Sequence, residues 1–290
     1  MKLALGTVQF GLDYGINNPR GKTPPDVARE ILLTAEKNGV DTIDTAYAYG
    51  ESEQVIGAYL GSEHSHFKVI SKLPPCATEE IGPIFRASLA RLQISGLYGY
   101  LFHDLDTFRG DRRKWEVLEG LKQDGLVRKI GFSLNDPSEL EYLLEQKVAL
   151  EIVQVPYNVL DQRFQRFFAL LREQGVEIHV RSVFLQGLLF KEPASLEARF
   201  LKIRDKLETM RMLARQAGVT LSALCINFAA ANTFIDRVVI GVDSMEHLHE
   251  DLRALEDLQR IMPVYDRIIA LSESDNSIII PSNWEKDTRA

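Results

Sequence analysis

The 290-residue chain contains few cysteines, no long apolar run and no excess of basic residues. Its two cysteines, Cys76 and Cys225, lie far apart without metal-ligand spacing, which indicates a reducing compartment and predicts no metal site. The net charge of −7 argues against nucleic acid as the main partner, because binding a phosphate backbone needs a basic face. No apolar run reaches roughly 18 residues and the N-terminal run is too short for a signal peptide. We therefore expect a cytoplasmic protein without a membrane partner.

Two phosphate-binding motifs are also missing. No G-x-G-x-x-G sequence follows an early strand, and no Gly-rich loop of the Walker type occurs. These absences argue against a doubly wound sheet, which is the alternative α/β architecture. Linkers rich in Pro, Gly or Ser are absent too, so the sequence predicts a single domain over residues 1–290, in which 272–290 form a C-terminal tail. With 45% apolar residues, this domain can bury a large core.

Short apolar runs alternate with amphipathic segments along the chain. The apolar runs predict strands at 3–6, 42–43, 68–71, 98–102, 128–132, 151–155, 176–180 and 238–240. The segments between them predict helices at 27–38, 53–60, 79–92, 113–124, 137–145, 163–174, 196–216, 221–230 and 245–258. Such alternation indicates a parallel sheet covered by helices. Eight strand–helix units in under 300 residues predict an α/β fold, the (β/α)8 TIM barrel.

Polar side chains lie where the predicted strands end. Asp44 follows the second strand and Tyr49 lies in the loop beyond it, before Ser52, the predicted cap of the next helix. Lys72 and His103 end the third and fourth strands. Taken alone, Asp44, Lys72 and His103 each have a structural explanation: a turn cap, a solvated lysine and a buried histidine. Because they come from adjoining units whose strand ends meet at one face, we expect them to converge.

The four side chains form a chemically coherent set. A phenol has a pKa of about 10, too high for ready proton donation near neutral pH, and a neighbouring ammonium lowers that pKa. Asp44 would keep Lys72 charged and oriented, Lys72 would tune Tyr49, and His103 would bond the same substrate oxygen. Such a set can protonate an alkoxide as it forms, which is what carbonyl reduction by a nicotinamide coenzyme requires.

Seven motifs in the sequence resemble those of the aldo-keto reductase family. They are Leu-Gly-Thr-Val-Gln-Phe-Gly (5–11), Ile-Asp-Thr-Ala-Tyr-Ala-Tyr-Gly (43–50), Ser-Lys (71–72), Leu-Phe-His (101–103), Lys-Ile-Gly-Phe-Ser (129–133), Val-Gln-Val-Pro-Tyr-Asn (153–158) and Arg-Ser-Val-Phe-Leu-Gln-Gly-Leu-Leu (181–189). The resemblance covers residues 5 to about 252 and implies a catalytic tetrad of Asp44, Tyr49, Lys72 and His103, with Tyr49 as general acid. It also implies coenzyme contacts from Gly6, Thr7, Ser133, Asn135, Gln154, Arg181, Ser182, Gly187, Leu188, Gly241, Asp243, His247, Glu250 and Asp251.

Within this resemblance, Ser133 and Gln154 are expected to hold the nicotinamide carboxamide, and the pair of Arg181 and Ser182 to lie against the nicotinamide ring and the diphosphate. Asn135 stands one position later than the Asn of the family pattern, so either it substitutes from there or one carboxamide bond is lost.

The segment after the last predicted strand departs from the family pattern. Family members carry Lys or Arg there to bind the 2′-phosphate of NADPH, whereas residues 241–247 contain Asp243 and no Lys or Arg, with His247 at a position where Arg or Gln is common. A helix N-terminus still offers N–H groups to phosphate. An acidic side chain repels a 2′-phosphate and can accept a bond from a free ribose 2′-OH. The expected coenzyme is NADPH with weakened preference, with NADH use or dual use as alternatives.

The expected function is therefore oxidation or reduction of a small carbonyl or alcohol substrate by a monomer or small homo-oligomer. Tyr47 and Trp284 are the expected substrate contacts, and Tyr14, Phe108, Trp115 and Phe184 are further candidate pocket aromatics. One alternative is a non-catalytic, nucleotide-binding regulatory protein on the same fold. Another is a barrel lyase or isomerase in which Lys72 forms a Schiff base.

Overall fold

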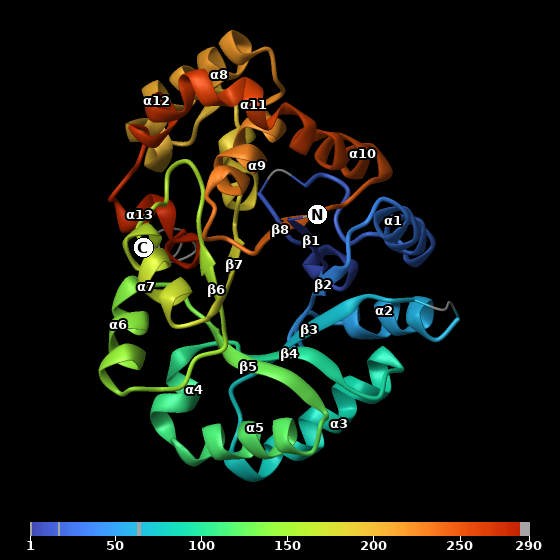
Figure 1. The fold of residues 1–290 in the computed structure, drawn as a ribbon. Coiled ribbons are helices and arrows are strands. Elements are labelled where there is room, and N and C mark those ends of the chain that lie inside the picture. The colour runs from blue at the N-terminus through green and yellow to red at the C-terminus, as the bar shows by residue number, and fades with distance from the viewer. Residues whose placement is uncertain (1, 17, 63–64, 285–290) are drawn as a thin grey trace.

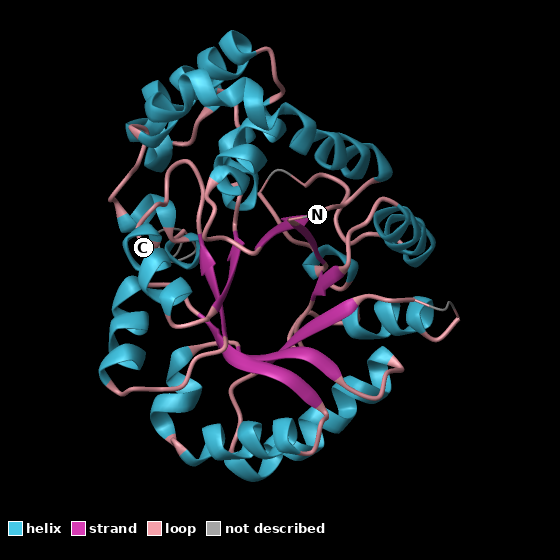
Figure 2. Cartoon of the chain, viewed as in Figure 1, coloured by secondary structure: helices cyan, strands magenta, loops and turns pink. Residues whose placement is uncertain are grey.

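Eight parallel strands close a barrel in chain order, with helices around it, in the computed structural model, which describes residues 2–16, 18–62 and 65–284 (Figure 1, Figure 2). The strands are β1 (Leu3–Gly6), β2 (Thr42–Asp44), β3 (Lys68–Leu73), β4 (Leu97–Phe102), β5 (Val127–Ser133), β6 (Ile152–Pro156), β7 (Glu177–Arg181) and β8 (Arg237–Gly241). The predicted (β/α)8 TIM-barrel fold is confirmed.

The α-helices cover the outside of this barrel (Figure 1). They are α1 (Pro25–Lys37), α2 (Ser52–Leu60), α3 (Ile81–Leu92), α4 (Leu105–Gly110), α5 (Arg113–Gln123), α6 (Pro137–Glu145), α7 (Phe168–Glu173), α8 (Arg204–Ala217), α9 (Leu221–Ala231), α10 (Met245–Ala254), α11 (Leu258–Ile261), α12 (Tyr265–Ile269) and α13 (Asn276–Ile279). Among the described residues, no helix is long and apolar enough to cross a membrane.

Two separate sets of apolar side chains stabilise the barrel and the helices around it. Inside the barrel, Ile70, Leu101 and Ile152 are fully buried and pack against one another as a plug. Outside it, Phe102 and Phe132 stack at 5.0 Å between ring centroids, within a larger aromatic cluster. Phe108 and Trp115 belong to that cluster, which makes them core residues and excludes them as pocket aromatics.

Helix boundaries follow local capping chemistry. The helix α6 begins at Pro137 because Asp136 and Glu139 form a capping box, as the sequence indicates. The short helix α4 was not predicted, although Asp104 accepts a hydrogen bond from the Thr107 N–H as its cap. The predicted helices at 163–174, 196–216 and 245–258 were too long, because each contains a stretch of 3-10 turns where the i to i+4 bonding is interrupted.

Ser52 does not cap α2, contrary to the sequence-based expectation. Its side chain is fully buried, and its hydroxyl donates to the Thr7 carbonyl oxygen at 2.9 Å instead of accepting from the helix. This bond ties the start of α2 to the end of β1, next to the loop that carries Tyr49.

The C-terminal tail packs against the segment around Phe200, outside the barrel. The Trp284 ring lies 5.1 Å from the Phe200 ring, and its indole N–H donates to the Ile278 carbonyl oxygen at 2.9 Å. This side chain is only 5% exposed, so its apolar contacts stabilise the tail. Residues 285–290 of the predicted tail lie outside the described residues.

Replacing Gly131 with Ala should destabilise the protein by about 3 kcal/mol or more, because overpacking a core strand forces the backbone to shift. A Cβ at Gly131 would lie 1.7 Å from the Ile152 carbonyl oxygen, whereas a Cβ at Gly120 in α5 meets no atom within 4 Å. Gly120→Ala is therefore the matched control and should stabilise by up to about 1 kcal/mol. Chemical denaturation measures both, and equal effects would contradict the packing argument.

Candidate functional site

Three neighbouring strands bring the predicted catalytic residues to the carboxyl end of the barrel. Asp44 ends β2, Lys72 lies near the end of β3, and His103 directly follows β4, while Tyr49 comes from the loop after β2. The strand register aligns these ends, since Asp44 pairs with Ile70 of β3. The geometric expectation that the four side chains converge is met.

Lys72 and Asp44 form a buried ion pair at the centre of this group. The Lys72 ammonium lies 2.7 and 2.8 Å from the two Asp44 carboxylate oxygens and also donates to the Thr45 carbonyl oxygen at 2.9 Å. Burial alone would lower the pKa of Lys72, but the Asp44 carboxylate, together with the hydrogen bonds to Asp44 and Tyr49, outweighs it and raises that pKa. Lys72 is therefore a fixed cation without access to solvent.

Tyr49 and His103 face the cavity next to that cation. The Tyr49 hydroxyl lies 3.5 Å from the Lys72 ammonium, and the Tyr49 and His103 rings meet edge to face at 5.7 Å. Burial, followed by the cations Lys72 and Arg181, lowers the pKa of His103 to about 4. The imidazole is therefore neutral near pH 7 and can exchange hydrogen bonds with a neutral substrate oxygen.

Gln154 lies on the opposite side of Asp44, within the barrel. Its amide nitrogen donates to Asp44 at 2.8 Å, and its amide oxygen is buried without a partner among the described residues. The side chain does not line the cavity, so its first role in the structure is to hold the carboxylate that holds Lys72. The unpaired oxygen remains an acceptor for an incoming N–H group.

An elongated cavity of about 720 Å³ runs from Tyr49 and His103 to helix α10, which is a size typical of small-molecule sites. Most of the residues expected to contact the coenzyme line it. They are Gly6, Thr7, Ser133, Asn135, Arg181, Ser182, Gly187, Gly241, Asp243, His247, Glu250 and Asp251. Leu188, like Gln154, is buried behind this lining.

The two expected substrate contacts are not in the cavity. The Tyr47 ring lies under the Arg91 guanidinium at 4.3 Å, on the helix side of the catalytic loop, and Trp284 is buried in the tail. Tyr47 misled the prediction because it shares a loop with Tyr49, yet the two side chains leave this loop in different directions.

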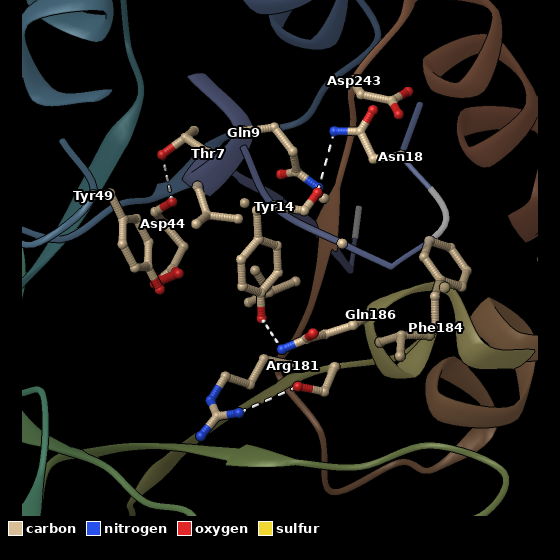
Figure 3. Close-up of a pocket in the computed structure, with 18 of the residues that line it drawn as sticks. Thr7, Gln9, Tyr14, Asn18, Asp44, Tyr49, Arg181, Phe184, Gln186 and Asp243 are labelled. Carbon is tan, nitrogen blue, oxygen red and sulfur yellow. Dashed lines mark hydrogen bonds between the residues drawn. The ribbon is translucent and has the colours of Figure 1, made fainter. Parts of the chain in front are cut away.

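The long connection between β1 and α1 covers one side of the cavity; Tyr14 was expected there as a pocket aromatic, whereas Gln9 and Asn18 were not assigned a role. Gln9, Tyr14 and Asn18 come from the long connection between β1 and α1 and line the cavity (Figure 3). The Tyr14 hydroxyl accepts from the Gln186 side chain at 2.9 Å, and the Ile16 N–H donates to the Gln186 carbonyl oxygen at 3.0 Å. The signal available in the sequence was position alone, because this connection also follows a strand end.

Arg181 lies between the catalytic groups and the loop after β7 (Figure 3). Its guanidinium donates to the Leu134 carbonyl oxygen at 3.0 Å, the Asn135 side-chain oxygen at 2.6 Å and the Ser182 hydroxyl at 3.2 Å. These bonds fix the cation in place. Ser182 has a φ of 58°, in the left-handed region, so the chain turns sharply after β7.

The far end of the cavity is acidic. Asp243 and His247 are bonded at 2.6 Å near the start of α10, and this bond lowers the pKa of Asp243 and raises that of His247. Deeper in the same end, Asp251 accepts a hydrogen bond from the Ser222 hydroxyl. Burial raises the pKa of Asp251 to about 7, with Glu250 adding to the effect.

Asp251→Asn should stabilise the protein increasingly as the pH rises from 4 to 8. The folded pKa of Asp251, about 7, lies above the ordinary value near 3.9, so stability is lost as the pH rises through this window. The gain in the free energy of unfolding of the variant over the wild type should grow by roughly 4 kcal/mol, because the shift is about three pKa units at about 1.4 kcal/mol each. Denaturation at several pH values measures it.

Glu246→Gln, at an exposed position of the same helix, is the control and should follow the wild-type curve. A gain from Asp251→Asn that does not change with pH would contradict the assignment.

These features define a barrel enzyme site in which a buried lysine–aspartate pair supports a phenol beside an elongated cavity. The sequence model of the aldo/keto reductase family matches residues 2–264. The chain therefore belongs to the aldo/keto reductase family, and it is an NAD(P)H-dependent oxidoreductase rather than a non-catalytic nucleotide-binding protein.

Individual relatives agree with this assignment. The uncharacterised oxidoreductase YqkF of Bacillus subtilis (strain 168) is 22% identical over 280 residues, which are 87% of this chain and 90% of that protein. The glyoxal reductase of the same organism is 32% identical over 171 residues, 56% of this chain and 60% of the relative. The holo form of aldo-keto reductase AKR11C1 from Bacillus halodurans has the same fold, with a TM-score of 0.74, 21% identity and 94% of each chain covered.

Proposed function

We propose that this enzyme interconverts an aldehyde or ketone and the corresponding alcohol, with Asp44, Tyr49, Lys72 and His103 as its catalytic residues. The observation that carries the proposal is the 3.5 Å contact between the Lys72 ammonium and the Tyr49 hydroxyl at the cavity wall. A phenol that faces a cavity and touches a fixed cation can supply a proton and hold the negative charge left on its oxygen.

Each residue has a distinct part in that proton transfer. Tyr49 gives its proton to the substrate oxygen as negative charge develops there, and takes it back in the reverse direction. Lys72, held by Asp44, stabilises the resulting phenolate. The neutral His103 orients the carbonyl oxygen toward Tyr49. In this scheme Tyr49 is the acid: Tyr49 and His103 line the cavity at the strand ends, and Lys72 lies behind Tyr49.

The residues present fit a nicotinamide dinucleotide. The cavity is long, and its lining includes backbone-exposing glycines and the start of α10, where helix N–H groups favour phosphate. The buried amide oxygen of Gln9, which lines the cavity, lacks a partner among the described residues and can accept a bond from a ligand N–H group. Ser133, Asn135, Arg181 and Ser182 would hold the nicotinamide end. When bound, the coenzyme supplies or accepts the hydride.

Schiff-base chemistry at Lys72 is disfavoured by the same geometry. An amine must be neutral and reach the substrate carbonyl to attack it. Lys72 donates to both Asp44 oxygens and to Thr45, has a raised pKa, and does not line the cavity. Its position suits a charged neighbour of Tyr49 rather than a nucleophile.

Tyr49→Phe should lower kcat by roughly 10²- to 10⁴-fold, the usual contribution of a general acid, while coenzyme affinity changes little. Tyr47→Phe is the matched control, because it removes a hydroxyl from the same loop outside the cavity and should leave kcat close to the wild-type value. Absorbance at 340 nm with a panel of aldehydes gives kcat, and fluorescence titration gives affinity. Unchanged turnover by Tyr49→Phe would remove the acid assignment.

For coenzyme choice, we propose that the enzyme accepts both NADPH and NADH, with the advantage of NADPH weakened by Asp243. This carboxylate lines the far end of the cavity, and its bond to His247 keeps it ionised. A carboxylate repels a 2′-phosphate and suits a free ribose 2′-OH. The segment 241–247 provides no Lys or Arg to offset that repulsion.

Asp243→Asn should therefore raise the affinity for NADPH relative to NADH by about tenfold, equivalent to about 1.4 kcal/mol. The repulsion disappears, and the His247 imidazole is released toward the phosphate. Titration of wild type and variant with each coenzyme measures the ratio, and Glu246→Gln serves as a charge-matched control on the same helix. A ratio that moves toward NADH would refute the role given to Asp243.

A further inference from the structure

Arg181 is an uncompensated cation in the cavity wall. Among the described residues that line the cavity it is the only lysine or arginine. Its hydrogen bonds go to the neutral oxygens of Leu134, Asn135 and Ser182. No carboxylate of the described chain lies within ion-pair distance of it, in contrast to Lys72, which Asp44 neutralises.

The other charges at this end of the cavity do not cancel that cation. Asp104 also lines the cavity and keeps its negative charge, but its carboxylate accepts from the N–H and hydroxyl of Thr107, as the cap of α4, and forms no ion pair with Arg181. The pKa of His103 shows how these charges act on a neighbouring group. After burial, the cations Lys72 and Arg181 are the largest causes of its lowered pKa, ahead of the opposing effects of Asp44 and Asp104. Arg181 is therefore the one lysine or arginine among the described lining residues, and it acts on this end without a carboxylate in contact with it.

The nicotinamide ring must lie near this cation if the proposed function is correct. Hydride passes to or from the carbon whose oxygen Tyr49 protonates, so the ring has to come next to Tyr49, at the end of the cavity where Arg181 lies (Figure 3). The reduced ring is neutral and the oxidised ring carries one positive charge. A fixed cation acts differently on the two, because like charges repel more strongly in a site shielded from water.

We propose that Arg181 makes the enzyme discriminate between the oxidation states of its coenzyme, so that it binds the reduced form more tightly than the oxidised form. Any contact that Arg181 makes with the diphosphate is the same in both forms and cancels in the ratio of their dissociation constants. The inference rests on the proposed function. It implies that the oxidised coenzyme leaves readily after each reduction and is a weak product inhibitor.

The test compares dissociation constants of the oxidised and reduced coenzyme, using whichever of the phosphorylated or unphosphorylated pair binds the wild type better. In Arg181→Gln, the ratio of oxidised to reduced dissociation constant should fall about tenfold, because the repulsion of the oxidised ring is removed. Arg181→Lys keeps the charge and should retain the wild-type ratio within about threefold. Calorimetric titration supplies all constants without turnover.

A second variant neutralises Arg181 without removing it. The Asn135 side-chain oxygen lies 2.6 Å from the guanidinium, so Asn135→Asp places a carboxylate against the cation at unchanged shape. The ratio of oxidised to reduced dissociation constant should fall in this variant as well. Asn135→Asp therefore tests the inference even if Arg181→Gln binds the coenzyme too weakly to titrate. Arg128→Gln, an exposed arginine at the opposite end of β5, is the control and should leave the ratio unchanged.

The outcomes separate this inference from the function on which it rests. An equal loss of affinity for both forms, with an unchanged ratio, would assign Arg181 to the diphosphate and overturn the inference while the function stands. An unchanged ratio in Asn135→Asp would overturn it too. A wild type that binds neither coenzyme would instead refute the proposed function.

Discussion

The buried ion pair between Lys72 and Asp44 is the interaction on which the rest of the site depends. Both side chains are almost fully removed from water, which is costly unless the charges meet and their remaining hydrogen bonds are made. Thr45 and Gln154 make those bonds. Removing either charge would leave the other buried and unpaired, so the pair is part of the fold as well as of the chemistry. Because protein groups make all of these bonds, the position of the cation next to Tyr49 is set by the fold.

Charge is distributed unevenly along the cavity. The catalytic end has Arg181 without a counter-ion, whereas the end at α10 carries Asp243, Glu250 and Asp251. Under the proposed function, different residues of one continuous cavity would serve the proton transfer and the binding of the adenosine.

The sequence was sufficient to predict the barrel and the convergence of the tetrad, because both follow from position. Parallel strands end on one face, so polar residues after consecutive strands meet there whatever their rotamers. Side-chain direction was not predictable in the same way. Tyr47 and Tyr49 share a loop, and only packing against Arg91 sends the first one outward.

Contacts between distant loops were not predictable from the sequence either. The hydrogen bond between Tyr14 and Gln186 joins residues 172 positions apart, and no local sequence pattern predicts it. Gln154 was expected at the nicotinamide, yet its amide nitrogen bonds Asp44, a contact across the barrel that depends on the closure of all eight strands. Trp284 was placed by its aromatic character alone, and the hydrophobic contact with Phe200 outweighed any attraction to the cavity.

The order of the strands around the barrel places three of the site residues on neighbouring strands. Asp44, Lys72 and His103 come from the ends of β2, β3 and β4, so their mutual placement relies on two adjacent strand pairings. The loops after β5 to β8 lie outside this unit. Insertions in those loops can reshape the cavity while the spacing of Asp44, Lys72 and His103 is kept, provided that Gln154 of β6 still donates to Asp44.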